Sequence, residues 1–160
     1  MVTKFLIVSL CITAGTMTGA VFSKRLKSRA CYFDELLGLV NRIMAEVKFR
    51  KNTTKSILTE FCKECTSPLV GHLTEYLNCT DYSALKLSKS ILTNDETEEV
   101  RKLLLSLGTS DSTTQLFELE NSRLKVSQML VTAEEKRKKL GGTYIKLGFF
   151  AGLTLGIIIL

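Results

Sequence analysis

The stretches that decide the fold read FLIVSLCITAGTMTGAVF at residues 5–22 and LGFFAGLTLGIIIL at residues 147–160. A helix that crosses the roughly 30 Å hydrocarbon core of a bilayer needs about 20 residues. Both stretches are a little short, with 18 and 14 residues, and Tyr144, Ile145 and Lys146 extend the second one inward. We therefore predict two transmembrane helices, one in residues 1–23 and one in residues 144–160. Residues 24–143, which lie between them, are expected to form a single domain.

Basic residues lie on the inner flank of each apolar stretch, and only Lys4 lies on an outer flank. By the positive-inside rule, residues 24–143 are therefore cytoplasmic. The same basic residues are expected to contact anionic lipid at the membrane surface. They are Lys24, Arg25, Lys27 and Arg29 after the first stretch, and Lys136, Arg137, Lys138 and Lys139 before the second.

The charge of the middle region argues against a nucleic-acid partner. The chain has a net charge of +6, but residues 51–135 hold nine basic and thirteen acidic residues. Positive charge is thus concentrated beside the apolar stretches, and no basic stripe with interleaved aromatic residues occurs.

Each apolar stretch has a second interpretation. Residues 5–22 resemble a secretory signal, because Lys4 precedes them and Thr18-Gly19-Ala20 is similar to a cleavage site. Residues 147–160 are also compatible with a buried core helix. The charge rule opposes export of the middle region, and a stretch that is apolar all round has no polar face for water.

Apolar residues recur at helical spacing in six stretches of the middle region, and none alternates with the period of a strand. The first continues from the membrane helix to about Phe49, and the last enters the second apolar stretch, with Gly141-Gly142 as its expected hinge. Of the other four, one is expected at residues 55–65 and one begins at Ser67-Pro68, where a cap precedes proline. A weaker helix is expected from Asp81, and the last of the four runs from the Thr93/Glu96 capping box to Gly108. The predicted fold is all-α: a cytoplasmic antiparallel bundle of about six helices flanked by two transmembrane helices.

Residues suited to chemistry are few. Cys62 and Cys65 have the CxxC spacing of redox and metal sites, but no second ligand pair follows, so we interpret both as buried small hydrophobic residues. His72, the only histidine, is expected to be partly exposed on its helix. We predict no catalytic, cofactor or metal site and no enzymatic activity. A thiol-based redox enzyme that uses the two cysteines is the minor alternative.

Glycines in both apolar stretches follow the small-xxx-small pattern of membrane helix packing. Glycines four residues apart lie on one face of a helix and allow another backbone to approach closely. The two faces are expected to pair with each other, with a second copy in a homo-oligomer, or with a partner protein. The alternative is that these glycines simply face lipid. These glycines are Gly15 and Gly19 in the first stretch, and Gly148, Gly152 and Gly156 in the second.

Taken in order, these features resemble the stage III sporulation protein AB family. The resemblance covers the whole chain: a first span with Gly19, basic residues up to Arg29, a helix around Glu46, the turn Leu107-Gly108-Thr109-Ser110-Asp111, and the tail from Tyr144 to Leu153 before an aliphatic end. One departure follows Phe49, where the family tends to have an aromatic residue followed by Thr-Pro-Leu and this chain has Thr53-Thr54-Lys55 without proline.

The resemblance implies a role that spacing alone does not show. Members belong to the sporulation channel between mother cell and forespore, and their domain is similar to that of the type II secretion system F platform protein. The implied partners are a secretion-type ATPase, the stage III sporulation protein AA, and other sporulation channel proteins. The chain would be a non-enzymatic platform in the bacterial cell membrane, on the mother-cell side of the forespore.

Exposed polar residues are the candidate contacts for a partner. Glu98 and Glu99 belong to an acidic first helical turn, and Gly108 and Asp111 bound the turn before the last helix. A membrane-anchored signalling or regulatory adaptor, whose helical domain binds a soluble partner, is the alternative function.

Overall fold

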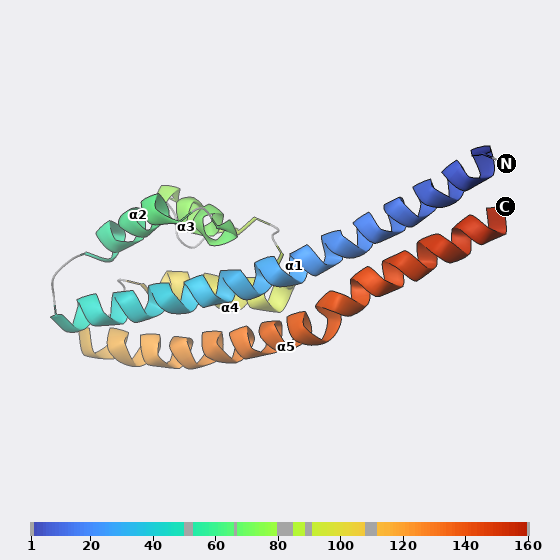
Figure 1. Ribbon diagram of the computed structural model, residues 1–160. Helices are drawn as coiled ribbons and strands as arrows, with labels where there is room; N and C mark the ends of the chain where they lie inside the picture. Colours follow the sequence, from blue (N-terminus) through green and yellow to red (C-terminus); the bar gives the residue numbers. More distant parts are fainter. Residues whose placement is uncertain are drawn as a thin grey trace. The chain divides into compact units, whose positions relative to one another are not determined.

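The computed structural model describes residues 2–49, 53–65, 67–79, 85–88, 91–107 and 112–159. Within these ranges the chain is all-helical and contains no strand, as predicted (Figure 1). The described helices are α1 (Val2–Phe49), α2 (Thr54–Glu64), α3 (Pro68–Asn78), α4 (Asn94–Ser106) and α5 (Ser112–Ile159). The first and last predicted bundle helices continue into the apolar stretches, and α5 passes through Gly141-Gly142 without a break in the helix.

The described ranges contain five helices, whereas about six were predicted. The start of the weak helix predicted from Asp81 lies outside the described residues, and the described residues Leu85–Ser88 are irregular. Side chains satisfy the backbone of this segment. Arg101 Nε donates to Leu85 O at 2.8 Å, and Ser88 N donates to a Glu75 carboxylate oxygen at 2.9 Å. Because side chains satisfy these backbone groups, the segment does not need the backbone hydrogen bonds of a helix.

The membrane prediction is supported for one helix. By length and composition, one helix among the described residues is apolar enough to cross a bilayer, the range Thr114–Ile158 within α5. The crossing predicted for residues 1–23 stays a prediction. These residues are helical from Val2 onward, as the first part of α1.

The chain divides into two compact units, and α1 and α5 contribute to both. The hairpin unit is Met1–Ala30 with Thr132–Leu160, and the bundle unit is Cys31–Val131. The divisions fall after residues 30 and 131, further toward the middle of the chain than the predicted boundaries after residues 23 and 143. In the hairpin unit the two helical segments run side by side (Figure 1).

Local signals explain where the short helices begin. The Ser67 hydroxyl accepts from Leu69 N at 3.3 Å, one residue after Pro68 opens α3. At α4 the predicted capping box is confirmed, because Thr93 Oγ1 accepts from Glu96 N and a Glu96 carboxylate oxygen accepts from Thr93 N. Thr53 precedes α2 as its N-cap but makes no side-chain capping bond.

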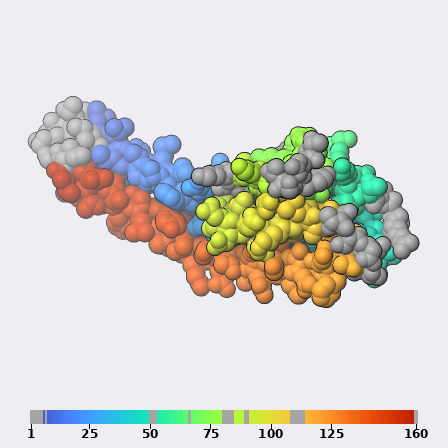
Figure 2. Space-filling view, turned by 180° about the vertical axis from the view of Figure 1, so that it is seen from behind, coloured from blue at the N-terminus to red at the C-terminus, as the bar shows by residue number. Residues whose placement is uncertain are grey.

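The core of the bundle unit is built from one face of each helix. The α1 segment supplies the largest share. The buried apolar residues of α5 in this unit, Leu119 and Val126, lie seven residues apart and thus on one face of the helix. Figure 2 shows the surfaces of α4 and α5, in yellow and orange, adjoining each other. Fully buried core side chains include Tyr32, Phe33, Leu36, Leu39 and Ile43 of α1, Ile57 and Leu58 of α2, Leu69 and Leu73 of α3, Leu104 of α4 and Leu119 of α5.

Candidate functional site

The predicted glycine ridges lie where the two helices of the hairpin unit meet. A Cβ atom on Gly15 would collide with the backbone carbonyl oxygen of Gly148, and a Cβ atom on Gly19 would collide with that of Tyr144. Because real Cβ atoms do not come this close to backbone, these positions need glycine. The structure thus brings the two ridges together within one chain.

The contact continues toward the ends of the two helices. A Cβ atom on Gly152 would lie 2.9 Å from Ile12 Cα and 2.5 Å from the carbonyl oxygen of Cys11. A Cβ atom on Gly156 would lie 3.1 Å from Cγ1 of Val8. Steps of four residues on one helix are matched by steps of four on the other, so the pairing is antiparallel and in constant register. Close backbone contact supplies van der Waals energy to this pairing, as small residues do between membrane helices.

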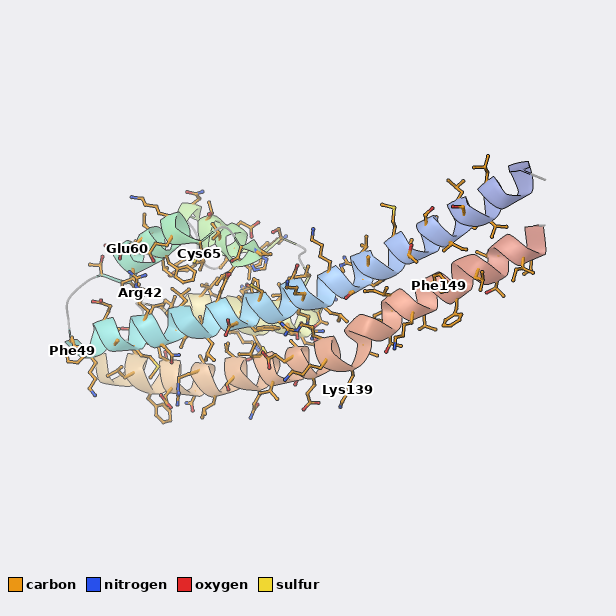
Figure 3. The ribbon with its side chains drawn as sticks, in the orientation of Figure 1. Arg42, Phe49, Glu60, Cys65, Lys139 and Phe149 are labelled. Atoms are coloured by element: carbon orange, nitrogen blue, oxygen red, sulfur yellow. The ribbon has the colours of Figure 1, made fainter. Side chains whose placement is uncertain are left out.

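The eight basic residues predicted at the membrane surface all belong to the hairpin unit. Two of them form ion pairs one turn along α5: Lys138 lies 3.8 Å from Glu134 and Lys139 lies 3.3 Å from Glu135. Lys139, labelled in Figure 3, is 75% exposed. Both pairs are therefore solvated and contribute little to stability.

The acidic contact candidates have different surroundings. Glu98 pairs with Arg101 at 3.0 Å on the exposed face of α4. Glu99 accepts from Lys102 of α4 and from Lys125 of α5, each at 2.9 Å, and these hydrogen bonds lower the pKa of Glu99. Glu98 is thus available to a partner, whereas Glu99 connects two helices. The other two candidates, Gly108 and Asp111, lie outside the described residues.

A groove of about 230 Å³ lies beside the Glu99–Lys125 pair, between α4 and α5. Its lining includes the apolar side chains of Val100, Leu103 and Val126. Sequence reasoning missed this groove. The helical period identified the apolar stripe on each helix but held no information on which two stripes face each other.

His72 is buried, and the prediction of partial exposure was wrong. Its side chain is 1% exposed, and both ring nitrogens are hydrogen bonded. Nε2 lies 3.2 Å from Ser88 O, which can only accept, so Nε2 carries the proton in the neutral ring. Nδ1 then accepts from the Tyr32 hydroxyl at 2.7 Å. A ring held in this way stabilises the fold and is not free to act as a general base.

Tyr32 is the partner that makes this burial favourable. Burial and the nearby charge of Glu75 raise the pKa of Tyr32 well above its usual value, so the hydroxyl keeps its proton. The rings of Tyr32 and His72 also meet edge to face, with centroids 5.6 Å apart. No signal in the local sequence pointed to this pair, because 40 residues separate its members.

The CxxC cysteines are only partly as predicted. Cys62 is half-buried on α2, and Cys65 is not on the helix but is its C-cap residue. Burial raises the pKa of both thiols, which keeps them protonated near neutral pH. A raised pKa is the opposite of what a nucleophilic or redox-active cysteine needs.

Arg42 fixes α2 against α1. Its guanidinium donates to Glu60 at 2.7 Å and to Glu64 at 2.8 Å, one helical turn apart (Figure 3). The hydrogen bond to Glu64 is the largest cause of the raised pKa of Arg42. A forked side chain can engage both carboxylates at once, which a lysine cannot do with the same geometry.

Exposed apolar residues form a stripe on α5 within the bundle unit. Phe117 is 69% exposed, Leu124 is 52% exposed and Val131 is 55% exposed. Residues seven apart on a helix lie on nearly the same face, so the three side chains form one row. The sequence did not show that this stripe is exposed. Leu116, Leu119 and Val126 on the neighbouring face have the same helical spacing, and spacing does not show which face is buried.

Comparison with known proteins identifies a family. A family model described as stage III sporulation protein AB matches residues 4–160, nearly the whole chain. Comparison with curated proteins and with solved structures finds no match. In the described part of the chain, no three histidine, cysteine or acidic residues gather where they could hold a metal ion.

Proposed function

The chain belongs to the stage III sporulation protein AB family, and from this premise we propose that it is a membrane platform of a sporulation channel complex. In this role it performs no chemistry. It holds its helical domain at the mother-cell membrane and couples a cytoplasmic secretion-type ATPase, the stage III sporulation protein AA, to channel rings in the membranes between mother cell and forespore.

The observation that carries the proposal is the glycine contact of the hairpin unit. Gly15 and Gly19 allow the first part of α1 to lie against the last part of α5 at backbone distance. Two paired apolar helices form a stiffer membrane anchor than one, because neither can rotate or tilt without breaking the close contact. A stiff anchor with basic residues on one flank suits a protein that holds a partner at the membrane surface.

The apolar stripe of α5 supports a protein-binding role for the bundle unit. Exposed Phe117, Leu124 and Val131 offer an apolar row of the kind found at protein contacts. We propose that the ATPase contacts this row and, on α4, the exposed Glu98 as a polar contact. Glu98 is preferred to Glu99 as the acidic contact, since Glu99 already binds two lysines.

The test is co-purification of the ATPase with the full-length chain from detergent-solubilised membranes. The double variant Phe117→Ser and Leu124→Ser is expected to lose most of the bound ATPase, and Glu98→Lys is expected to weaken binding. Asp34→Lys is the matched control, because Asp34 is exposed on α1 and makes the same charge change elsewhere. Loss of binding in the control alone would contradict the assigned surface.

A second result separates this function from a signalling adaptor. Suppose that the unaltered chain does not retain the ATPase, but that deletion of the chain still blocks sporulation. The platform proposal then fails, and an adaptor with another partner is favoured. Membrane orientation is tested separately, with a variant that keeps only the exposed Cys31. A thiol reagent that does not cross lipid should leave this variant unlabelled in intact cells, and labelling would place the bundle unit on the wrong side.

A further inference from the structure

A pocket of about 510 Å³ lies between the two helices of the hairpin unit, and its charge is one-sided. Lys24 and Lys27 of α1 and Arg137 of α5 line it, and no acidic residue is among its lining residues. None of the three forms an ion pair with a carboxylate in the described part of the chain. The carboxylates nearest in sequence, Glu134 and Glu135, pair with Lys138 and Lys139 instead.

The register of the hairpin places like charges opposite each other. Gly19 lies against Tyr144, and a Cβ atom on Gly141 would lie 3.5 Å from Ser23 Oγ. One further turn along both helices brings Lys27 level with Arg137. Two cations that face each other across a pocket repel, and an anion between them would turn this repulsion into attraction. The arrangement is therefore suited to an anionic ligand.

The pocket also has room and polar groups for such a ligand. Gly142 lines it, and a Cβ atom on Gly142 would meet nothing within 4 Å. Packing therefore does not require glycine at this position, unlike at Gly15. Ser23 adds a hydroxyl that can donate a hydrogen bond, and an arginine fork matches the geometry of phosphate oxygens.

The remaining lining distinguishes a lipid from a free ion. Ala20 and Ile145 line the end of the pocket that continues into the glycine contact, and both are apolar. Free phosphate has no apolar part that could contact these two side chains. A phospholipid does, because its phosphate is joined to a glycerol backbone and acyl chains. Basic pockets between membrane helices on the cytoplasmic side bind anionic headgroups in this way.

We propose that this pocket binds the phosphate headgroup of an anionic phospholipid, held by Lys24, Lys27 and Arg137. The proposal rests on the membrane placement in the proposed function but not on the ATPase. A bound lipid would join the two helices at the membrane surface, one turn beyond the last glycine contact. It would thereby make the orientation of the hairpin unit depend on the anionic lipid content of the membrane.

The experiment measures binding of fluorescent phosphatidylglycerol to the purified full-length chain in a neutral detergent at about 0.5 M salt, where diffuse attraction is screened. The double variant Lys27→Gln and Arg137→Gln is expected to weaken binding about tenfold for each charged hydrogen bond to the phosphate that is lost. The matched control, Lys138→Gln and Lys139→Gln, removes the same charge from residues outside the pocket and is expected to bind as the unaltered chain does.

A second variant tests the pocket without changing its charge. Gly142→Leu places a large apolar side chain on the lining of the pocket, so it is expected to weaken lipid binding while circular dichroism shows unchanged helix content. Phosphatidylcholine, which has no net charge, is expected not to compete. The proposal is overturned if both charge pairs weaken binding equally, if Gly142→Leu binds normally, or if millimolar inorganic phosphate displaces the lipid.

Failure of this proposal can be told apart from failure of the proposed function. Extraction of membranes with alkaline carbonate shows whether the chain is inserted, without any lipid preference. An inserted chain that does not bind phosphatidylglycerol contradicts the pocket alone. A chain that carbonate removes from the membrane contradicts the membrane anchor on which the platform role depends.

Discussion

The hydroxyl oxygen of Tyr32 lies 2.7 Å from Nδ1 of His72 in the interior of the bundle unit, although 40 residues separate the two in sequence. Through Nε2 the same ring holds Ser88 O at 3.2 Å. Three segments, α1, α3 and the irregular residues before α4, therefore meet at one imidazole. A buried polar group of this kind stabilises a fold only while every hydrogen bond is made.

Tyr32→Phe is expected to destabilise the bundle unit by about 1–3 kcal/mol, because Nδ1 of His72 would be buried without a donor. Urea unfolding of the full-length chain in detergent, followed by circular dichroism, measures the change. Tyr76→Phe is the matched control, since its hydroxyl makes a longer hydrogen bond of 3.4 Å to Leu107 O. An equal or larger loss in the control would contradict a special role for the Tyr32–His72 pair.

The stability supplied by Tyr32 is expected to decline at alkaline pH. Burial raises the pKa of Tyr32 in the folded chain, whereas the unfolded chain releases this proton near pH 10. The folded state then holds the proton more tightly, so the contribution is complete below about pH 10 and falls as pH rises further. The difference in unfolding free energy between the unaltered chain and Tyr32→Phe should shrink above that pH. A difference that stays constant above pH 10 would contradict the predicted loss of stabilisation by Tyr32.

Glu99→Gln is expected to weaken the contact between α4 and α5 by about 1 kcal/mol or less, as partly exposed ion pairs do. Hydrogen bonds from Lys125 and Lys102 lower the pKa of Glu99 in the folded chain. Its contribution is therefore present above the unfolded pKa of about 4.3 and is lost as pH falls through the lower folded value. Unfolding measured from neutral to acidic pH should show this loss. Glu98→Gln, which removes only a pair within α4, should show a smaller effect.

Gly15→Ala and Gly142→Ala are expected to change stability in opposite directions. Alanine at Gly15 places a methyl group against the carbonyl oxygen of Gly148, which costs about 1–3 kcal/mol. Alanine at Gly142 meets nothing within 4 Å and gains up to about 1 kcal/mol of helix propensity. Thermal unfolding in detergent compares the two variants. Equal destabilisation would show that the helices of the hairpin unit do not meet along the glycine ridges.

Much of the local structure followed from short-range patterns. Pro68 after Ser67 and Glu96 three residues after Thr93 predicted the starts of α3 and α4, because each signal acts within one helical turn. The weak helix from Asp81 was not found in the described residues 85–88. There the backbone is held by Arg101 and Glu75, which local spacing does not reveal.

Sequence alone determined which segments are helical, which of their faces are apolar, and where basic residues gather, because composition and period act along a single helix. Tertiary structure alone decided which faces meet. Burial of His72 depended on a tyrosine 40 residues away. The one-sided pocket depended on the register that sets Lys27 level with Arg137. Both arise from contacts between distant segments, and only the geometry of packing determines those contacts.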